Sequence, residues 1–324
     1  AVSKLVGGSA SEIAQSAADI LQLGAEPGAS GYDVFVAGDA ITGEISARAD
    51  ASGKVVQAEE KKNPVPETLS RAAAGAFLLM RTQVNDMTKR LGDLRAMPEE
   101  SGAWARVIAG KAKYRSYSSD YQTLQAGADG RIGNFFIGGT ASHTKGDGKM
   151  RNGDSDDRLC SFGLYGGWLG EAGQFVDVVV KRGRIRSDFK VRNPSSGARY
   201  KGRLDPDVTT VSAEAGWRVA LGEGSWFVEP QAELVYGRMG SAKARADGVT
   251  LKLGSADMLI GRVGAAAGWT SPGKKGSAYF RASALKDFRG DVKAEALAGG
   301  SSRKVKAEMG GAWGEFALGG TFNF

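Results

Sequence analysis

The sequence predicts an all-β fold, an antiparallel β-barrel that spans a membrane and is threaded by one α-helix. From about residue 100 to its end, the chain alternates apolar and polar residues with the period of two that is typical of strands. A stretch of helix-forming residues precedes this region. Gly is abundant, with 48 residues against 8 Pro, which favours many turns and closely packed strands.

The composition is compatible with a membrane barrel and argues against a helical membrane protein. Hydrophobic residues make up 42% of the chain, and a barrel reaches such an ordinary share because lipid-facing apolar residues alternate with polar ones. The longest apolar run, residues 72–80, is far shorter than the roughly 20 residues of a spanning helix. The N-terminus lacks a basic segment followed by an apolar one, so we expect a fragment that starts downstream of any signal.

Cofactors, metals and nucleic acids are not expected. The single Cys160 cannot form an internal disulfide, and the lone His143, in a segment that reads as a loop, lacks partners for a metal site. The net charge is +7, but the basic residues are mixed with acids and form no dense patch of the kind that binds nucleic acid. Basic residues near the rim of a barrel could instead meet anionic lipid head groups.

The first two regions of the chain precede the barrel. Residues 1–62 contain a possible short helix at 9–23 and segments suited to short strands at 32–38 and 41–49. Residues 63–95 begin with two prolines and continue as a helix predicted from Glu67 to Leu94. Such a helix would be roughly 40 Å long, enough to cross a membrane inside a pore. Towards its end the polar residues lie on all sides, which suits a wet lumen; they are Gln83, Asn85, Asp86, Thr88, Lys89 and Arg90.

The third region, residues 96–324, is all strand. Around residues 209–221, Val211, Ala213 and Trp217 lie on one face and Glu214 on the other; in the next strand Val228 and Leu234 oppose Glu233. We expect ten strands, which start near Gly102, Tyr121, Asn134, Arg158, Gln174, Asp207, Trp226, Thr250, Ser277 and Lys304.

A soluble sandwich would produce the same alternation, and that alternative stays open on pattern alone. Two features favour the membrane barrel. Several segments alternate for ten or more residues, whereas soluble strands usually run about 5 to 6. The Trp residues fall in separate strands, as in an interfacial aromatic girdle; they are Trp104, Trp168, Trp217, Trp226, Trp269 and Trp313.

Several motifs resemble the autotransporters, and most closely the serine protease autotransporters of enterobacteria. They are QVNDMTKRLGDLR (83–95), SGAWARVIAG (101–110), FVDVVVK (175–181), AEAGWR (213–218), WFVEPQAELVYG (226–237) and LIGRVGAAAG (259–268). The resemblance covers about residues 30–324. It implies a translocator in the bacterial outer membrane that carries its own passenger to the cell surface, by the route called type V secretion.

The resemblance also implies how the chain is divided. Residues 1–62 would be the C-terminal, autochaperone-like end of the passenger, 63–95 the linker and pore helix, and 96–324 the barrel. The family's barrel has twelve strands, so we expect the barrel here to be truncated at its C-terminus. The implied partners are outer-membrane lipid, the chain's own passenger, the barrel-assembly machinery and periplasmic chaperones, and we expect a monomer.

A chemical role is implied by the family's cleavage site in the pore helix, which matches Asn85 followed by Asp86. The Asn85 side-chain amide would attack its own backbone carbonyl, and lumen acids would move the protons; the acids match Asp177, Glu214 and Glu233. Enzymatic activity would be at most a single-turnover autoproteolysis. The alternatives are that the acids only pair with lumen cations, and that the barrel anchors an uncleaved, adhesin-type passenger.

Overall fold

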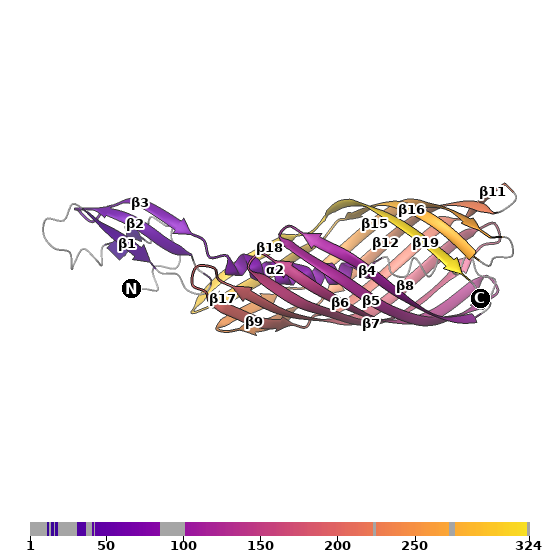
Figure 1. The fold of residues 1–324 in the computed structure, drawn as a ribbon, viewed down its shortest axis with the longest axis horizontal. Helices are drawn as coiled ribbons and strands as arrows, with labels where there is room; N and C mark the ends of the chain where they lie inside the picture. The colour runs from indigo at the N-terminus through magenta and orange to yellow at the C-terminus, as the bar shows by residue number, and fades with distance from the viewer. Residues whose placement is uncertain are drawn as a thin grey trace.

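The computed structural model of the chain describes residues 12, 14–15, 17–18, 31–36, 41, 43–84, 101–222, 225–271 and 276–322. Figure 1 shows an elongated molecule, in which a small sheet at one end leads through a helix into a long, strongly curved sheet. No helix in the described ranges combines the length and the apolar character needed to cross a membrane.

The small sheet contains the strands β1 (Gly31–Val36), β2 (Glu44–Asp50) and β3 (Val55–Lys61), paired antiparallel in that order. The short strands expected in the first region are therefore confirmed. Residues 12, 14–15 and 17–18 are helical. The Gln15 side chain joins them to the sheet, because its amide donates to the Gly53 carbonyl at 2.8 Å and accepts from the Val55 amide at 2.8 Å.

The helix α2 (Val65–Arg81) begins where the prolines place it, with the Val65 amide donating to the Asn63 side chain. The predicted end at Leu94 is wrong, since the helix ends at Arg81 and residues 82–84 form a turn. The Thr82 hydroxyl donates to the Leu79 carbonyl at 2.7 Å, and the Gln83 side chain donates to Ser161 on the barrel wall at 2.6 Å. Contacts with the wall therefore override helix propensity here. Residues 85–94 lie outside the described residues.

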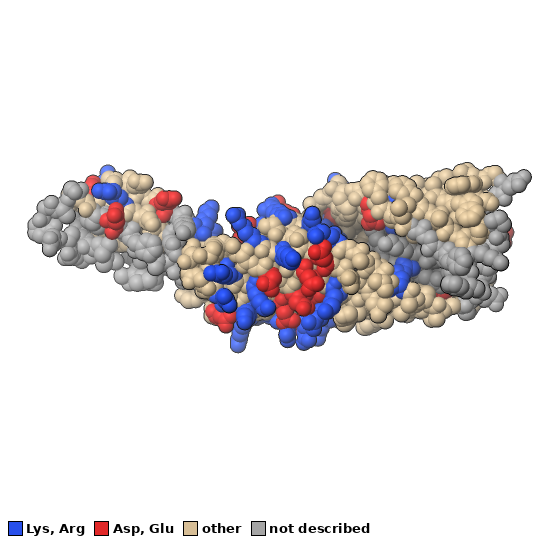
Figure 2. Space-filling model, viewed as in Figure 1, with Lys and Arg blue, Asp and Glu red and all other residues tan. Residues whose placement is uncertain are grey.

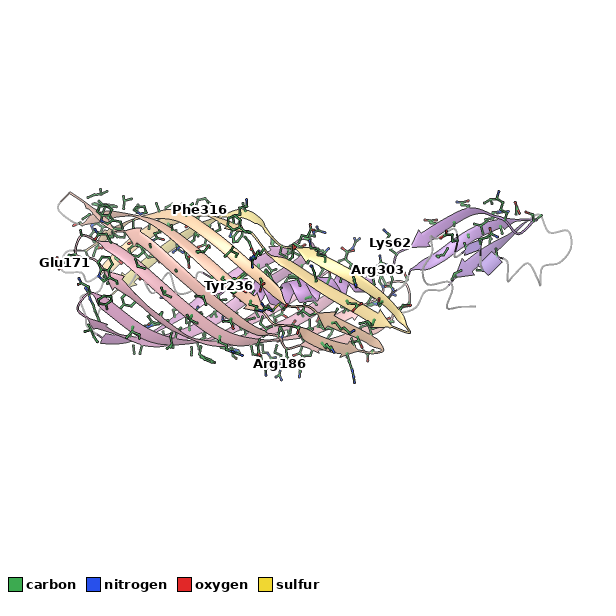
Figure 3. The ribbon with its side chains drawn as sticks, turned by 180° about the vertical axis from the view of Figure 1, so that it is seen from behind. Lys62, Glu171, Arg186, Tyr236, Arg303 and Phe316 are labelled. Carbon is green, nitrogen blue, oxygen red and sulfur yellow. The ribbon has the colours of Figure 1, made fainter. Side chains whose placement is uncertain are left out.

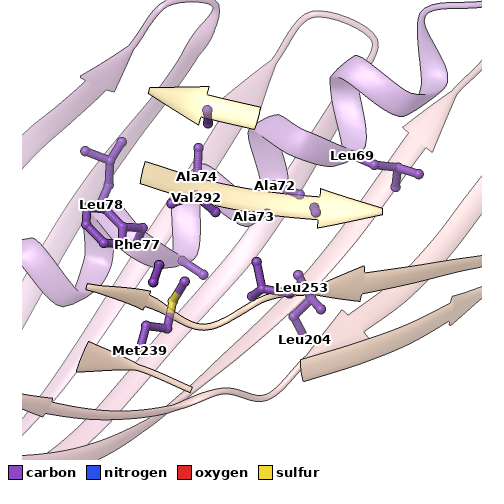
Figure 4. Close-up of a cluster of buried hydrophobic side chains, with 14 of the residues drawn as sticks. Leu69, Ala72, Ala73, Ala74, Phe77, Leu78, Leu204, Met239, Leu253 and Val292 are labelled. Carbon is purple, nitrogen blue, oxygen red and sulfur yellow. The ribbon is translucent and has the colours of Figure 1, made fainter. Parts of the chain in front are cut away.

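The helix α2 is enclosed by apolar side chains. Fifteen of its residues are buried, including Ala72, Phe77 and Met80. Figure 4 shows the helical side chains meeting Leu204, Met239, Leu253 and Val292 from the surrounding strands. The helix is therefore held mainly by burial of apolar area.

The curved sheet has ten long antiparallel strands, each hydrogen-bonded to the next. They are β4 (Ser101–Tyr114), β5 (Tyr117–Ile132), β6 (Phe135–Met150), β7 (Gly153–Leu169), β8 (Gln174–Arg192), β10 (Asp207–Trp217), β12 (Trp226–Met239), β15 (Ala256–Thr270), β16 (Gly276–Asp287) and β19 (Gly311–Phe322). Two short strands extend it, β9 (Arg199–Leu204) beside β8 and β11 (Val219–Leu221) beside β12. Among the described residues, no ladder joins β19 to β4.

A separate four-stranded sheet contains β13 (Ala242–Ala246), β14 (Val249–Leu253), β17 (Asp291–Ala298) and β18 (Ser301–Glu308). Two predicted starts of barrel strands are therefore wrong. Thr250 lies in β14 and Lys304 in β18 of this sheet, whereas the corresponding barrel strands begin at Ala256 and Gly311. These hairpins also alternate apolar and polar residues, because their inner faces cover α2. Alternation alone cannot separate them from the barrel strands.

The outer face of the barrel is apolar, as predicted. Val211, Trp217 and Leu234 are 39%, 48% and 54% exposed, whereas Glu214 and Glu233 are buried. Ala213 is also exposed, and Val228 is partly exposed. A soluble sandwich would bury these residues against a second sheet, so that alternative is wrong.

The Trp girdle is only partly present. The side chains of Trp168, Trp217, Trp226 and Trp269 lie on the outward positions of their strands. Trp104 points inward and donates to the Tyr165 hydroxyl at 2.9 Å. Trp313 contacts Arg81 of the helix. Two of the six Trp residues thus serve packing inside the barrel.

A border divides the outer face into an apolar and a charged part. On β8 the outward residues Val176, Val178 and Val180 are followed by Arg182 and Arg184. Figure 2 shows charged side chains gathered at the end of the barrel near β9 and β17, and Figure 3 shows Arg186 on the outside at that end. The apolar part is the surface that meets lipid.

This border can be measured with two single-cysteine variants made in a Cys160→Ser background. A fluorophore on Val178→Cys should be strongly quenched by quenchers attached to lipid chains. The same fluorophore on Lys190→Cys should not be, although it lies on the same face of the same strand. Equal quenching at both positions would contradict the border.

Gly75 fixes how deeply the helix sits. A Cβ atom added at Gly75 would lie 2.5 Å from the ring of Tyr117, closer than atoms pack. The Tyr117 hydroxyl donates to Asp157 at 2.7 Å, which holds the ring in place. Only Gly lets the helix approach β5 this closely.

Gly75→Ala should therefore destabilise the barrel by about 1–3 kcal/mol, the typical cost of overpacking. Thermal unfolding in detergent micelles would measure it. Adding Tyr117→Leu to this variant should recover part of the loss by making room for the methyl group. Unchanged stability of Gly75→Ala would show that the helix is free to shift.

Candidate functional site: an acid cluster in the lumen

Three buried carboxylates lie side by side on the inner wall. Asp177 is on β8, Glu214 on β10 and Glu233 on β12. Glu214 is directly opposite Asp177 on one side and Glu233 on the other. Their exposed fractions are 1%, 3% and 6%. The structure therefore brings the three acids named from the sequence to one level of the lumen.

Arg262 on β15 is the counterion of two of these acids. Its Nη2 lies 3.1 Å from Glu214 Oε2, and its Nε lies 2.7 Å from Glu233 Oε2. Its Nη1 also donates to Gln231 at 3.1 Å. The Arg262 side chain is fully buried. A guanidinium suits this position because its fixed fork can serve several acceptors at once.

The helix ends just above this cluster because Arg81 anchors it. Arg81 donates to the Asp287 carboxylate and to the Met309 carbonyl, the latter at 2.9 Å. Its guanidinium also lies over the rings of Phe77 and Trp313, 5.4 and 5.1 Å from their centres. These contacts fix the point at which the chain leaves α2.

The turn after the helix enters the acid cluster. Lys181 donates to the Gln83 carbonyl at 3.4 Å. A cavity of about 10 Å³ is lined by Gln83 and Val84 together with all three acids. Asn85 and Asp86 lie outside the described residues. Since consecutive Cα atoms are about 3.8 Å apart, Asn85 directly follows a residue that touches this cavity.

Sequence reasoning missed the cations at this site. Arg262 lies within one of the motifs quoted above, as a charged residue on an inward position of a Gly- and Ala-rich strand. A single charged residue on the inward face of such a strand indicates an acidic partner nearby, because a buried charge requires a partner. Arg81 gave no such signal, since its partner Asp287 is far away in the sequence.

The remaining candidate residues do not join the cluster. His143 was expected in a loop, but it lies within β6 on the outer face, with its Nδ1 3.1 Å from Cys160 Sγ. The error arises because residues 144–150 look like a polar loop but continue the strand. In the described ranges, no group of three His, Cys, Asp or Glu side chains could hold a metal ion.

An apolar outer belt, a charged lumen and a helix inside one end define an outer-membrane translocator barrel. Residues 103–324 match the family model described as the autotransporter beta-domain. The chain belongs to this family, whose β-domain resides in the bacterial outer membrane.

Relatives of known name agree with this assignment. The chain is 31% identical over 252 residues to the pertactin autotransporter of Bordetella parapertussis, covering 72% of this chain and 27% of the relative. It is 30% identical over 225 residues to the serine protease Sat autotransporter of Escherichia coli O6:H1, covering 64% and 16%. The chain thus spans little more than a quarter of these relatives at most.

Solved structures support the fold. The β-domain of the Bordetella autotransporter BrkA has a TM-score of 0.55 at 23% identity, covering 70% of this chain and all of that one. The translocator domain of NalP from Neisseria meningitidis has a TM-score of 0.54 at 10% identity, covering 76% and 97%.

The buried Arg262 can be tested against an exposed counterpart. Arg262→Leu should destabilise the barrel by about 3–5 kcal/mol, because it leaves two buried carboxylates without their counterion. Arg238→Leu is the control, since Arg238 lies 3.9 Å from Asp257 in a largely exposed pair, which is worth about 0–1 kcal/mol. Urea unfolding in micelles would compare them, and equal losses would contradict the structural role of Arg262.

Proposed function

We propose that this translocator releases its passenger after transport by breaking the bond between Asn85 and Asp86 inside the barrel. The supporting observation is that Gln83 and Val84, which precede this bond, line the same cavity as Asp177, Glu214 and Glu233. Acids that meet the chain at this point are in position to move protons during a reaction of Asn85.

The proposed reaction is a cyclisation. The Asn85 side-chain nitrogen attacks its own backbone carbonyl carbon, and one of its protons passes to a carboxylate. The bond to Asp86 then breaks, and the departing nitrogen takes a proton from a carboxylic acid. The products are a succinimide at Asn85 and a free amine at Asp86. An amide is a poor nucleophile, so the reaction depends on a positioned base and on a held geometry.

The three acids would divide these roles by their surroundings. Arg262 holds Glu214 and Glu233 in place by ion pairs. Asp177 lines the cavity together with Gln83 and Val84, and we assign it the role of general base. Lys181, through the Gln83 carbonyl, would hold the chain for attack.

The parts of the chain take corresponding roles. We assign β1–β3 to the end of the passenger, residues 63–95 to the linker and pore helix, and residues 96–324 to the translocator. The barrel would act as a monomer, inserted by the barrel-assembly machinery with the help of periplasmic chaperones. The proposed cleavage follows the likeness to the serine protease autotransporters. The translocator's own task would be the same for a passenger like that of the pertactin autotransporter.

A second candidate function is anchoring of an uncleaved, adhesin-type passenger. The observation that favours it is the ion pairing of Arg262 with both glutamates, which is also what a purely structural cluster would show. Asp86 adds a further negative charge at the leaving side of the bond and would oppose cleavage. In this case the acids would keep the helix in place and carry no chemistry.

Mass spectrometry of the membrane-inserted protein decides between the two. Cleavage should produce a new N-terminus at Asp86, and Asn85→Asp should abolish it without unfolding the barrel. Asp177→Asn should slow cleavage by about 10² to 10⁴-fold, as expected for loss of a general base. Asp207→Asn, an acid on the outward face of β10, is the control and should cleave normally. A wild-type chain that stays intact for days would establish the anchor instead.

A further inference from the structure

Four basic side chains form a compact cluster, here called the basic tetrad, at the tip of the β8–β9 hairpin. On the ladder Lys190 is directly opposite Lys201, and Arg192 is directly opposite Arg199. The four alternate with buried residues such as Val191 and so share the outward face. Opposite residues have Cβ atoms about 5 Å apart, so four positive charges lie within a small square.

Within the described ranges, the tetrad differs from Arg184 and Arg203 of the same hairpin in forming no ion pair, although Asp154 on β7 is directly opposite Lys190. Arg184 pairs with Asp207 at 2.8 Å, and Arg203 pairs with Asp188 at 2.6 Å. In the part of the chain that the structure describes, no acid forms an ion pair with any of the four tetrad residues. Like charges directly opposite each other on a sheet are destabilising, so the hairpin holds the tetrad at a cost.

The tetrad also lines a hollow. A cavity of about 710 Å³ is bounded by the four side chains, with Asn152, Pro194 and Asp154 at its edges. One acid against four cations leaves the hollow strongly positive. Its volume is in the range of small-molecule sites, so a ligand with several negative charges could enter it.

The hairpin that carries the tetrad is rigid. On its inner side Val191 and Tyr200 are buried in the core around the helix. At its turn the Asn193 side chain accepts from the Ser195 amide at 2.9 Å, and the Asn193 amide donates to the Ala198 carbonyl at 2.8 Å. A rigid support keeps the four charges together before any ligand binds, which lowers the cost of binding.

The position of the tetrad indicates where its ligand lies. It is on the same face of β8 as the lipid-facing Val176, Val178 and Val180. Ten residues separate Val180 from Lys190. At about 3.3 Å per residue and a tilt near 45°, this places the tetrad roughly 20–25 Å beyond the apolar belt. That height lies above the lipid chains, in the layer of head-group sugars.

We infer that the basic tetrad binds the phosphorylated sugars of an outer-leaflet glycolipid. Two arginines supply planar forks that match phosphate oxygens bidentately, and two lysines add point charges. A bound phosphate would also relieve the repulsion between the opposed pairs. The ligand would hold the translocator among its surrounding lipids at the end of the barrel nearest the passenger.

Binding would be measured with the full chain in nanodiscs of zwitterionic lipid, by adding a glycolipid with phosphorylated core sugars. Binding should be saturable and should weaken as salt is raised. Phosphatase treatment of the core sugars should lower the affinity about tenfold or more. Equal binding of the lipid portion without its core sugars would overturn the proposal, as would equal competition by nucleic acid or by an acidic peptide. Inorganic phosphate should compete only weakly.

Replacing all four tetrad residues by Gln should likewise lower the affinity about tenfold or more. The control is Arg184→Gln with Arg203→Gln, which removes cations of the same hairpin that already have partners and should change the affinity less than about twofold. The tetrad variant should unfold at the same or a higher temperature, since it loses a repulsion. A milder variant, Arg192→Lys with Arg199→Lys, keeps the charge and should show an intermediate loss. Unchanged affinity in the tetrad variant would overturn the inference.

Discussion

The depth of the helix in the barrel is the constraint on which the other features depend. Gly75 contacts the ring of Tyr117, and Arg81 reaches Asp287, so the helix is fixed at its middle and at its end. A shift by one turn would move the chain by about 5.4 Å and would take Gln83 out of the acid cluster. The chemistry proposed for the lumen therefore depends on these packing contacts of the helix, none of which involves a reacting group.

Charged side chains form buried ion pairs on the inner face of the strands and exposed ion pairs on the outer face. Inside, Arg262 is fully buried and holds two carboxylates, in surroundings where losing a partner is costly. Outside, the ion pairs are exposed and individually weak. In the described ranges the tetrad differs from Arg184 and Arg203 of its hairpin, because its four cations form no ion pair. This contrast indicates that the tetrad binds a ligand and does not stabilise the protein.

Alternation predicted the two faces of the barrel, because it determines which side chains point inward. The three acids were named from the family resemblance, and their shared level depends on the register between strands. Alternation did not predict where a strand leaves the barrel, since β13, β14, β17 and β18 also alternate while covering the helix. The helix end was also missed, because Gln83 is an ordinary helix residue whose bond to Ser161 on the wall depends on the tertiary fold. Pairings such as Arg81 with Asp287 are determined by the fold and cannot be predicted from the sequence around either residue.

The apolar packing around α2 has a consequence for the permeability of the membrane. An ion that passed along the helix would have to give up its hydration shell among side chains such as Phe77, Leu204 and Val292. Removing a charge from water into such surroundings costs tens of kcal/mol by a continuum estimate. The apolar packing around Val65–Arg81 thus opposes the passage of an ion beside the helix.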